Sequence, residues 1–503
     1  MIRTSRALAL AGVLTGLSGL ATAQATVWIL RAPNGPVDAV AAAVRDYTPG
    51  GMAHHLIKLV RHLDKPLLLI GTSVILLAIC AWAGTQSQRR PLVPDVVYFV
   101  LGVIGLLAVL RLPNSGTASA FAIIVGLVTW IVVHRLLTAP LVTTGGELDQ
   151  AARRSFLQRA AWGSLAVGAT VVVGWISDGS KRAAEQSRDL VRLDGVSGGK
   201  VPAGADLGVD GIAAWRTPNK KFYRIDTAFR VPYIKAGDWK LRIHGMVDRE
   251  LTLTYQDLVD RQFTEAWITL CCVSNEVGDK LISNAFWSGV KISDILAEAG
   301  VHPDADAVLQ TSDDGWTCGT PLSALTDDRN AMLALAMNGD KLPFEHGFPV
   351  RMVVPGLFGY VSATKWVVDL NVTRFDKFDA YWTERGWSEK GPVVTESRID
   401  VPRDGGHSRT GTIKVGGSAW AQHTGIEHVE YQLDGGSWQQ ATLGKVPDLD
   451  TWVQWSGEVD VAHGKHTLVV RATDRSGYTQ TSVRTDVIPS GATGWHTIHF
   501  EAG

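Results

Sequence analysis

The chain has 503 residues, a net charge of −1 and a pI near 6.9, which exclude the strongly basic surface that nucleic-acid binding requires. Mean hydropathy is slightly positive, at +0.08, and the apolar excess lies almost entirely in the first third of the chain. This length is too great for one hydrophobic core and predicts about three units.

Five uncharged apolar stretches in the first third have the composition of membrane-spanning helices, which need about 20 apolar residues. They are Ala7–Leu30, Pro66–Gly84, Val96–Leu110, Gly116–Val133 and Ala160–Ile176. The alternative is a set of buried helices in a soluble core. Five such stretches in close succession favour a membrane domain over residues 1–177.

Arginines in the short loops set the orientation of such a bundle by the positive-inside rule. Most of them would share the cytoplasmic face: Arg3, Arg6, Arg89, Arg90, Arg135, Arg153 and Arg154. Arg111 occupies the short loop on the other side. The chain after Ile176 is therefore predicted to lie outside the cytoplasm, as part of a multi-pass protein of the cell membrane. Cleavage of the first stretch as a signal peptide at Ala21-Thr-Ala23 would leave that outcome unchanged.

The longer outer loop contains Met52–Leu63, whose pattern predicts an amphipathic helix on the membrane surface. His54, His55 and His62 lie in this loop, on the face opposite to His134. A haem held by one histidine of each group is therefore not expected. The sequence also has no Cys-x-x-Cys-His motif for attaching a c-type haem.

The string Arg153-Arg-Ser-Phe-Leu-Gln158 stands just before the last apolar stretch. It resembles a twin-arginine export signal, which serves proteins that fold around a cofactor before translocation. The alternative is a simple pair of positive-inside arginines. We favour the export signal, because orientation alone would not require Ser, Phe and Leu at the next three positions.

The remaining chain divides into three parts by pattern. Residues 178–207 are charged and rich in glycine, which predicts a linker. Residues 208–395 mix strand-like and helix-like segments and predict an α+β domain. Its predicted strands are residues 228–246 and 307–311. Its predicted helices are residues 254–261 and 293–299. Residues 396–503 show strand-like runs, with Asp434-Gly-Gly436 predicting a hairpin turn, and indicate a β-sandwich.

Cys272 lies in Ile268-Thr-Leu-Cys-Cys-Val-Ser-Asn-Glu-Val-Gly278, where an apolar run meets a polar loop. A thiol at the edge of a strand is suited to a soft metal, although a lone cysteine beside apolar residues is more often a buried hydrophobe. The segment resembles the molybdenum-binding core of the sulfite oxidase family of molybdopterin enzymes. In that family a Thr-Leu-x-Cys-x-x-Asn string carries the cysteine that binds molybdenum.

The resemblance extends from Asn219 to about the C-terminus and implies a Mo-molybdopterin oxidoreductase with Cys272 as the catalytic metal ligand. The segments His346–Gly356 and Gly359–Trp366 resemble its pterin-binding stretch. Within them the resemblance implies three cofactor contacts, by His346, Arg351 and Lys365. Arg351 suits a bidentate anion contact, and Lys365 adds a point charge. The alternative for each cation alone is an ordinary surface residue.

Two further segments carry weaker resemblances. Asn219–Thr227 resembles the family's first pterin-contacting segment, which implies contacts by Tyr223 and Arg224. A core aromatic is the alternative for Tyr223. The segment Thr311–Trp316 resembles a loop near the metal, which implies a hydroxyl contact from Thr311.

The chain departs from sulfite-oxidising members at informative positions. Glu276 and Val277 stand at two basic positions, Asp226 lies near the place of a sulfite-holding arginine, and Trp316 replaces a tyrosine. Sulfite is a small dianion, and its site needs convergent positive charge. We therefore expect a neutral or larger substrate, such as an S- or N-oxide. Sulfite oxidase activity remains the alternative.

Cys271 is expected on the opposite strand face from Cys272, which leaves metal ligation to Cys272. A disulfide between Cys271 and Cys318 stays open at this stage. Electrons are expected to pass to a quinone or to a separate redox protein. The resemblance implies that residues 396–503 form an immunoglobulin-like dimerisation domain, and therefore a homodimer. The alternative function is a catalytically silent, membrane-tethered adhesion or scaffold protein.

Overall fold

A computed structural model of the chain describes residues 2–30, 32, 34–48, 63–112, 116–142, 150–177 and 179–503. The chain forms two compact units, Met1–Ala183 with Ala228–Arg230, and Ala184–Thr227 with Val231–Gly503. Each unit has its own hydrophobic clusters. Most of the predicted outer-loop helix, with His54, His55 and His62, lies outside the described residues.

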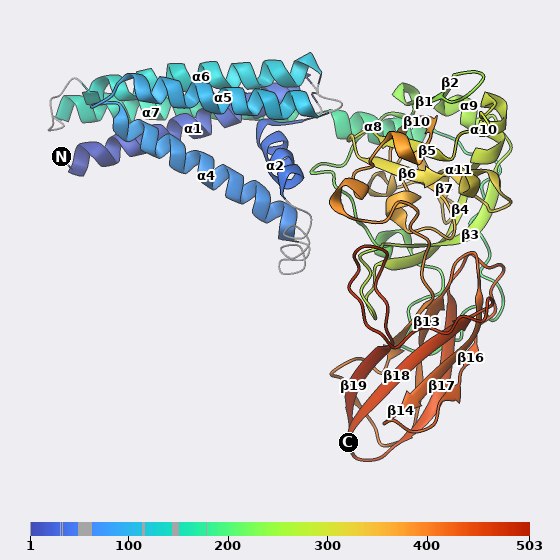
Figure 1. Ribbon diagram of the computed structural model, residues 1–503. Helices are drawn as coiled ribbons and strands as arrows, with labels where there is room; N and C mark the ends of the chain where they lie inside the picture. Colours follow the sequence, from blue (N-terminus) through green and yellow to red (C-terminus); the bar gives the residue numbers. More distant parts are fainter. Residues whose placement is uncertain are drawn as a thin grey trace. The chain divides into compact units, whose positions relative to one another are not determined.

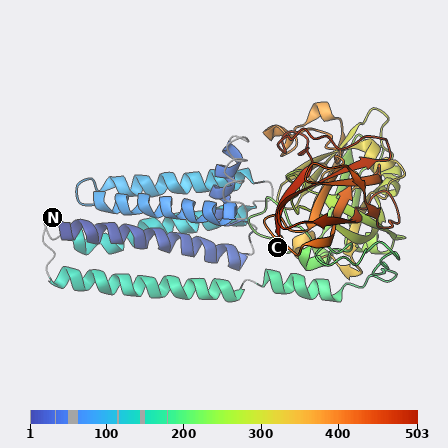
Figure 2. The same ribbon diagram turned by 90° about the horizontal axis from the view of Figure 1, so that it is seen from below.

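The first unit consists of helices. They are α1 (Ile2–Leu30), α2 (Pro36–Tyr47), α4 (Asp64–Gln86), α5 (Leu92–Arg111), α6 (Thr117–Val142) and α7 (Gln150–Ser177). Within the described residues, five helices are long and apolar enough to cross a membrane, and they contain the five predicted stretches. Figures 1 and 2 show α1, α5 and α6 running side by side.

Glycines allow α1 and α4 to approach closely. A Cβ atom on Gly12 would overlap the carbonyl oxygen of Cys80, and one on Gly84 would overlap that of Leu8. Small residues of this kind are typical of helix contacts in membranes.

His134 on α6 is buried among the helices. Its Nε2 lies 3.0 Å from the Ser87 hydroxyl and its Nδ1 lies 3.1 Å from the Tyr98 hydroxyl. Both ring nitrogens therefore have protein partners.

The second unit begins with a β-rich half built from two sheets. The first sheet has the order β2 (Leu251–Thr254), β1 (Lys240–Gly245), β10 (Val367–Thr373), β5 (Ala307–Ser312), β6 (Thr317–Pro321). The second has the order β3 (Thr264–Cys271), β4 (Ile282–Lys291), β7 (Met332–Met337), β8 (Asp340–Lys341), with β9 (Arg351–Val353) also paired to β7. The helices are short: α9 (Tyr255–Val259), α10 (Ile292–Ala299) and α11 (Leu322–Thr326).

The predicted helices and the strand at residues 307–311 are confirmed within a few residues by α9, α10 and β5. The prediction of a strand over residues 228–246 is wrong in its first part, because β1 begins only at Lys240. Pro232 has no N–H for a sheet ladder, and Ala236–Asp238 form a 3-10 turn around Gly237.

Two further sheets face each other across one core and form a β-sandwich. One sheet has the order β11 (Glu396–Val401), β13 (Gly411–Trp420), β17 (Val453–Val461), β16 (Thr442–Leu443). The other has the order β12 (His407–Ser408), β19 (His496–Ala502), β18 (Gly464–Asp474), β14 (Ile426–Leu433), β15 (Gln439–Gln440). Val415 and Trp455 from the first sheet share the core with Val470 from the second. The hairpin predicted at residues 434–436 is confirmed, since β14 pairs with β15.

The segment interpreted as a linker contains α8 (Ser180–Leu190) and is partly fixed. Arg188 donates to the carbonyl oxygens of Lys341 and Leu342 at 2.6 and 2.9 Å. The Lys341 ammonium donates back to the Arg188 carbonyl at 2.7 Å. The end of α8 is thereby bonded to the second sheet of the β-rich half.

The β-rich half and the sandwich are joined by buried polar contacts. The indoles of Trp215 and Trp452 donate reciprocally to each other's carbonyl oxygens at 3.1 and 2.9 Å. On β3, the amide of Thr269 donates to the Asp450 carbonyl, and its hydroxyl accepts from the Trp452 amide. The strand that leads to Cys272 is therefore held by residues of the sandwich.

Candidate active site

A cavity of about 120 Å³ opens in the β-rich half of the second unit. It lies where the loop after β3 meets the segments around residues 222–227, 312–316 and 359–366. Five of the predicted site residues line it together: Tyr223, Cys272, His346, Arg351 and Lys365. Arg224 and Thr311 are not among its lining residues.

Cys272 is positioned by the end of β3. Its amide donates to the Leu281 carbonyl at 2.9 Å, directly after the pairing of Cys271 with Ile282. Burial raises the pKa of the Cys272 thiol, and hydrogen bonds from Ser274 oppose that effect. A bound metal would stabilise the thiolate, because coordination deprotonates a thiol. The Cys272 sulfur is therefore suited to a buried soft metal.

Cys271 is buried and does not line the cavity, as strand alternation predicts. Its thiol donates to the Cys272 carbonyl at 3.5 Å. All four cysteines are free thiols, so the disulfide left open between Cys271 and Cys318 does not form.

Arg351 presents a buried cation to the cavity. Its guanidinium makes long contacts to the carbonyl oxygens of Met352, His346 and Ala363 at 3.3–3.4 Å, and it lies over the Trp287 ring at 5.0 Å from the centroid. Burial lowers the pKa of Arg351 to about 10, so it stays charged at neutral pH. In the described part of the chain no carboxylate forms an ion pair with it. A bound anion would therefore stabilise this buried charge.

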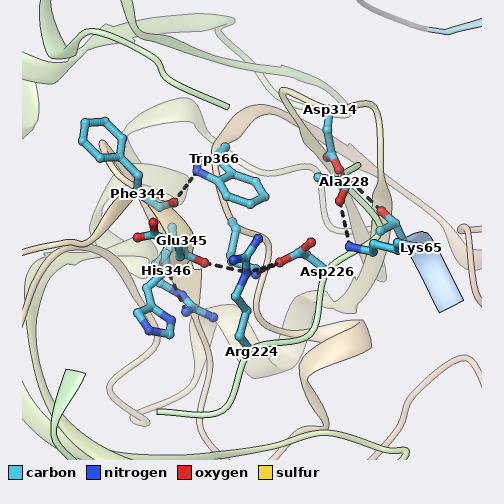
Figure 3. Close-up of polar contacts among 12 residues, drawn as sticks. Lys65, Arg224, Asp226, Ala228, Asp314, Phe344, Glu345, His346 and Trp366 are labelled. Carbon is cyan, nitrogen blue, oxygen red and sulfur yellow. Dashed lines mark hydrogen bonds and ion pairs between the residues drawn. The ribbon is translucent and has the colours of Figure 1, made fainter. Parts of the chain in front are cut away.

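Lys365 and Arg224 share one carboxylate. The Lys365 ammonium lies 3.0 Å from Oδ2 of Asp226 and 3.3 Å from the Glu345 carbonyl, and Arg224 Nε lies 2.9 Å from the same Asp226 oxygen (Figure 3). Burial lowers the pKa of Lys365 to about 8, although Asp226 raises it. Arg224 and Lys365 thus share Asp226, while Arg351 has no carboxylate partner among the described residues. The cluster keeps an excess of positive charge that suits a phosphate.

His346 is neutral and offers an acceptor. Its Nε2 lies 3.0 Å from the Asn219 carbonyl, which can only accept, so this nitrogen carries the proton. Burial lowers the pKa of His346 to about 4, with further lowering by Arg351 and Lys365. In the expected contact of His346 with the cofactor, Nδ1 would therefore act as the hydrogen-bond acceptor.

Tyr223 lies against the cavity as an undissociated phenol, because burial and the two neighbouring cysteines raise its pKa well above the usual value. The Arg224 side chain is 43% exposed and reaches the site through Asp226. Thr311 pairs with Thr317 on β6, and alternation along β5 gives the cavity Ser312 instead. The Ser312 hydroxyl is buried without a hydrogen-bond partner. The alternation of side chains along the strand was the sequence signal that would have indicated Ser312, rather than Thr311, as the cavity residue.

Of the four residues at which the sequence differs from sulfite-oxidising enzymes, two line the cavity. Asp226 and Trp316 line it, whereas Glu276 and Val277 do not; Val273 and Ser274 take the places beside Cys272. Sequence reasoning also missed a set of lining residues from separate loops: Asp314, Tyr360, Trp382 and Trp387.

The lining residues fit a metal-bearing cofactor with an anionic group. Cys272 provides a soft ligand, and Arg351 and Lys365 provide buried positive charge. Gly347 has a φ of 108°, and a Cβ there would lie 2.9 Å from the Cβ of Arg351. Its lack of a side chain lets Arg351 sit against the backbone of the preceding turn.

Comparisons with known proteins agree with this geometry. Residues 228–382 match the family model of the oxidoreductase molybdopterin binding domain. Human mitochondrial sulfite oxidase is 27% identical over 339 residues, which cover 56% of this chain and 61% of that protein. The uncharacterized oxidoreductase YuiH of Bacillus subtilis strain 168 is 33% identical over 170 residues, covering 34% of this chain and 82% of YuiH.

The crystal structure of the sulfane dehydrogenase SoxCD from Paracoccus pantotrophus is also similar. It matches with a TM-score of 0.51 and 25% identity, covering 57% of this chain and 81% of that one. The chain spans only 61% of the length of the macaque and human sulfite oxidases that it matches. These similarities argue against the catalytically silent scaffold. The chain therefore belongs to the sulfite oxidase family of molybdopterin-binding oxidoreductases, and it is an enzyme with a Mo-molybdopterin cofactor.

Proposed function

We propose that the protein is a membrane-anchored oxidoreductase that performs oxygen-atom transfer, or related two-electron chemistry, on a small molecule other than sulfite. We further propose that its catalytic site lies outside the cytoplasm. The observation that carries the catalytic proposal is the meeting of the Cys272 thiol with the Arg351 and Lys365 cations in one cavity.

The roles follow from the chemistry of each side chain. Cys272 would hold the metal, and Arg351 and Lys365 would bind the phosphate of the pterin. His346 would accept a hydrogen bond at Nδ1, and the Tyr223 phenol would donate one. When bound, the cofactor supplies the two-electron redox chemistry and the oxygen-atom transfer. The residues position it in a buried site, which limits the access of water.

The charges around the cavity favour a substrate other than sulfite. The carboxylates of Asp226 and Asp314 both line it. Lys365 and Arg224 pair with Asp226, and Arg351 is assigned to the cofactor, so neither lining cation is left to offset Asp314. A dianion would meet like charge without a dedicated cation, and such contacts cost several kcal/mol.

Sulfite is accordingly expected to be a poor substrate. With the molybdenum-loaded enzyme and ferricyanide as acceptor, we expect kcat/KM for sulfite to fall about 100-fold or more below that for the best S- or N-oxide, assayed with a reduced dye. Molybdenum content, measured on the same sample, controls for empty enzyme. Brisk oxidation of sulfite would refute the charge argument.

The membrane topology that we propose rests on the five apolar helices and on the arginines between them. Arg153 and Arg154 are exposed near the start of α7, where an export machinery can reach them. Electrons would pass to a membrane quinone or to a separate redox protein. The sandwich of residues 396–503 would act as an immunoglobulin-like dimerisation domain.

Replacement of both Arg153 and Arg154 with lysine is expected to leave the second unit inside the cell, because twin-arginine export depends on the arginine pair rather than on charge. The measurement is cleavage of that unit by protease added to intact spheroplasts. Arg159→Lys, on the same helix, serves as the control and should expose the unit normally. Normal protease sensitivity in the double variant would contradict the export proposal.

A further inference from the structure

One wall of the cavity is aromatic. It is formed by Trp316, Tyr360, Trp382 and Trp387, which come from three separate segments. The ring centroids of Trp382 and Trp387 are 6.1 Å apart at an interplanar angle of 78°, and those of Tyr360 and Trp387 are 5.8 Å apart at 49°. Trp316 and Trp382 are only partly buried, so part of their surface stays open.

This aromatic wall is fixed by hydrogen bonds before any ligand binds. The Tyr360 hydroxyl donates to the Ser388 carbonyl at 2.7 Å, and the Trp387 amide donates to the Trp382 carbonyl at 3.2 Å. The Tyr381 amide donates to the Thr317 hydroxyl at 3.0 Å, which holds the segment beside Trp316. The rings therefore form a preorganised surface.

A carboxylate lines the same cavity. Asp314 accepts from the Trp316 amide at 3.3 Å and from the Thr227 hydroxyl at 3.4 Å, and both donors are neutral. Neither of these two bonds brings a positive charge to the carboxylate. Arg385 lies over the Tyr381 ring at 3.8 Å and is not among the lining residues. The lining cations Arg351 and Lys365 belong to the cluster assigned to the cofactor.

Aromatic faces beside a carboxylate are the chemistry that recognises organic cations, because the negative face of each ring attracts a positive charge too large for tight hydration. We propose that this wall and Asp314 bind a cationic group of the substrate, such as a quaternary ammonium. The inference rests on the proposed function and narrows it: the substrate is a cationic S- or N-oxide, or its reduced counterpart.

The test uses three methyl phenyl sulfoxides that differ only in the para substituent. The substituents are trimethylammonio, its neutral isostere tert-butyl, and carboxylate. Binding of the three matching sulfides to the molybdenum-loaded enzyme is measured by calorimetry. Reduction of the sulfoxides is measured with a zwitterionic sulfonatopropyl viologen, because ordinary viologens are themselves organic cations.

The cationic sulfide is expected to bind about tenfold more tightly than the tert-butyl isostere, and about 100-fold more tightly than the carboxylate. In Asp314→Asn the advantage over the isostere should shrink to about threefold, with the isostere's own affinity unchanged. Trp382→Leu should reduce it similarly. Glu384→Gln, which removes an exposed carboxylate from the same segment, is the matched control and should leave the advantage intact.

The outcomes separate the two proposals. Equal binding of all three sulfides by the wild-type enzyme would overturn the cation inference, whether or not the variants fold. Reduction of the three sulfoxides with equal kcat/KM would also overturn it, while leaving the proposed function standing. Preferential binding of the cation without reduction of any sulfoxide would support the recognition site and count against an oxide as the substrate.

Discussion

Serine in place of Cys272 is expected to lower turnover by more than about 100-fold, since the loss of partners that merely support a metal ligand already costs 10–100-fold. A serine hydroxyl is a hard ligand with a high pKa, and it replaces a soft thiolate in a buried position. The cation cluster of Arg351 and Lys365 is untouched. Cofactor should therefore remain bound while its metal–thiolate bond is lost, which X-ray absorption at the molybdenum edge can measure.

Cys271→Ser is the matched control for that experiment. Its side chain is buried away from the cavity, so the metal–thiolate signal should persist. Loss of the signal in Cys271→Ser, with its retention in Cys272→Ser, would reverse the assignment of the ligand.

Arg351→Met is expected to separate the stability of the cofactor-free protein from its capacity to bind cofactor. Without an anion, the buried guanidinium carries a desolvation cost that its long carbonyl contacts and the Trp287 ring offset only in part. Methionine fills a similar volume without charge, so the cofactor-free variant should be as stable as the wild type or more stable by about 1–4 kcal/mol. The same change should reduce retained molybdenum by at least about tenfold, because removal of a buried charge partner costs about 2–5 kcal/mol.

Two measurements check this result: thermal unfolding of protein made without a working cofactor pathway, and molybdenum content of protein made with one. Lys365→Met is the comparison. Lys365 pairs with Asp226, so its loss should weaken cofactor retention without stabilising the cofactor-free protein. Full molybdenum content in Arg351→Met would show that Arg351 does not bind the anionic group of the cofactor. A lower melting temperature of the cofactor-free variant would show that Arg351 stabilises the fold instead.

The sequence predicted best what depends on short-range pattern. Uncharged apolar length predicted the five long helices, and alternation along β3 predicted the separation of Cys271 from Cys272. Alternation along β5 was not used for the prediction. It would have favoured Ser312 over Thr311 as the residue that faces the cavity.

What could not be predicted depends on loops that meet only in three dimensions. Trp382 and Trp387 lie in an irregular segment with no periodic pattern, and its hydrogen bonds to Thr317 and Tyr360 join positions far apart in the chain. Glu276 follows Cys272 by four residues, yet the turn after β3 carries it away from the cavity. Proximity in sequence was therefore a poor guide to proximity in space beyond the ends of the strands.

The reciprocal indole bonds between Trp215 and Trp452, and the contacts of Thr269 with Asp450, have a consequence for the modularity of this enzyme. A chain shortened to end before residue 396 would leave the Trp215 indole without its partner Trp452, and it would remove the Asp450 and Trp452 contacts of Thr269 on the strand that leads to Cys272. The C-terminal sandwich thus helps to support the catalytic centre. If evolution exchanged this domain for another, the new domain would need a tryptophan equivalent to Trp452 to pair with Trp215.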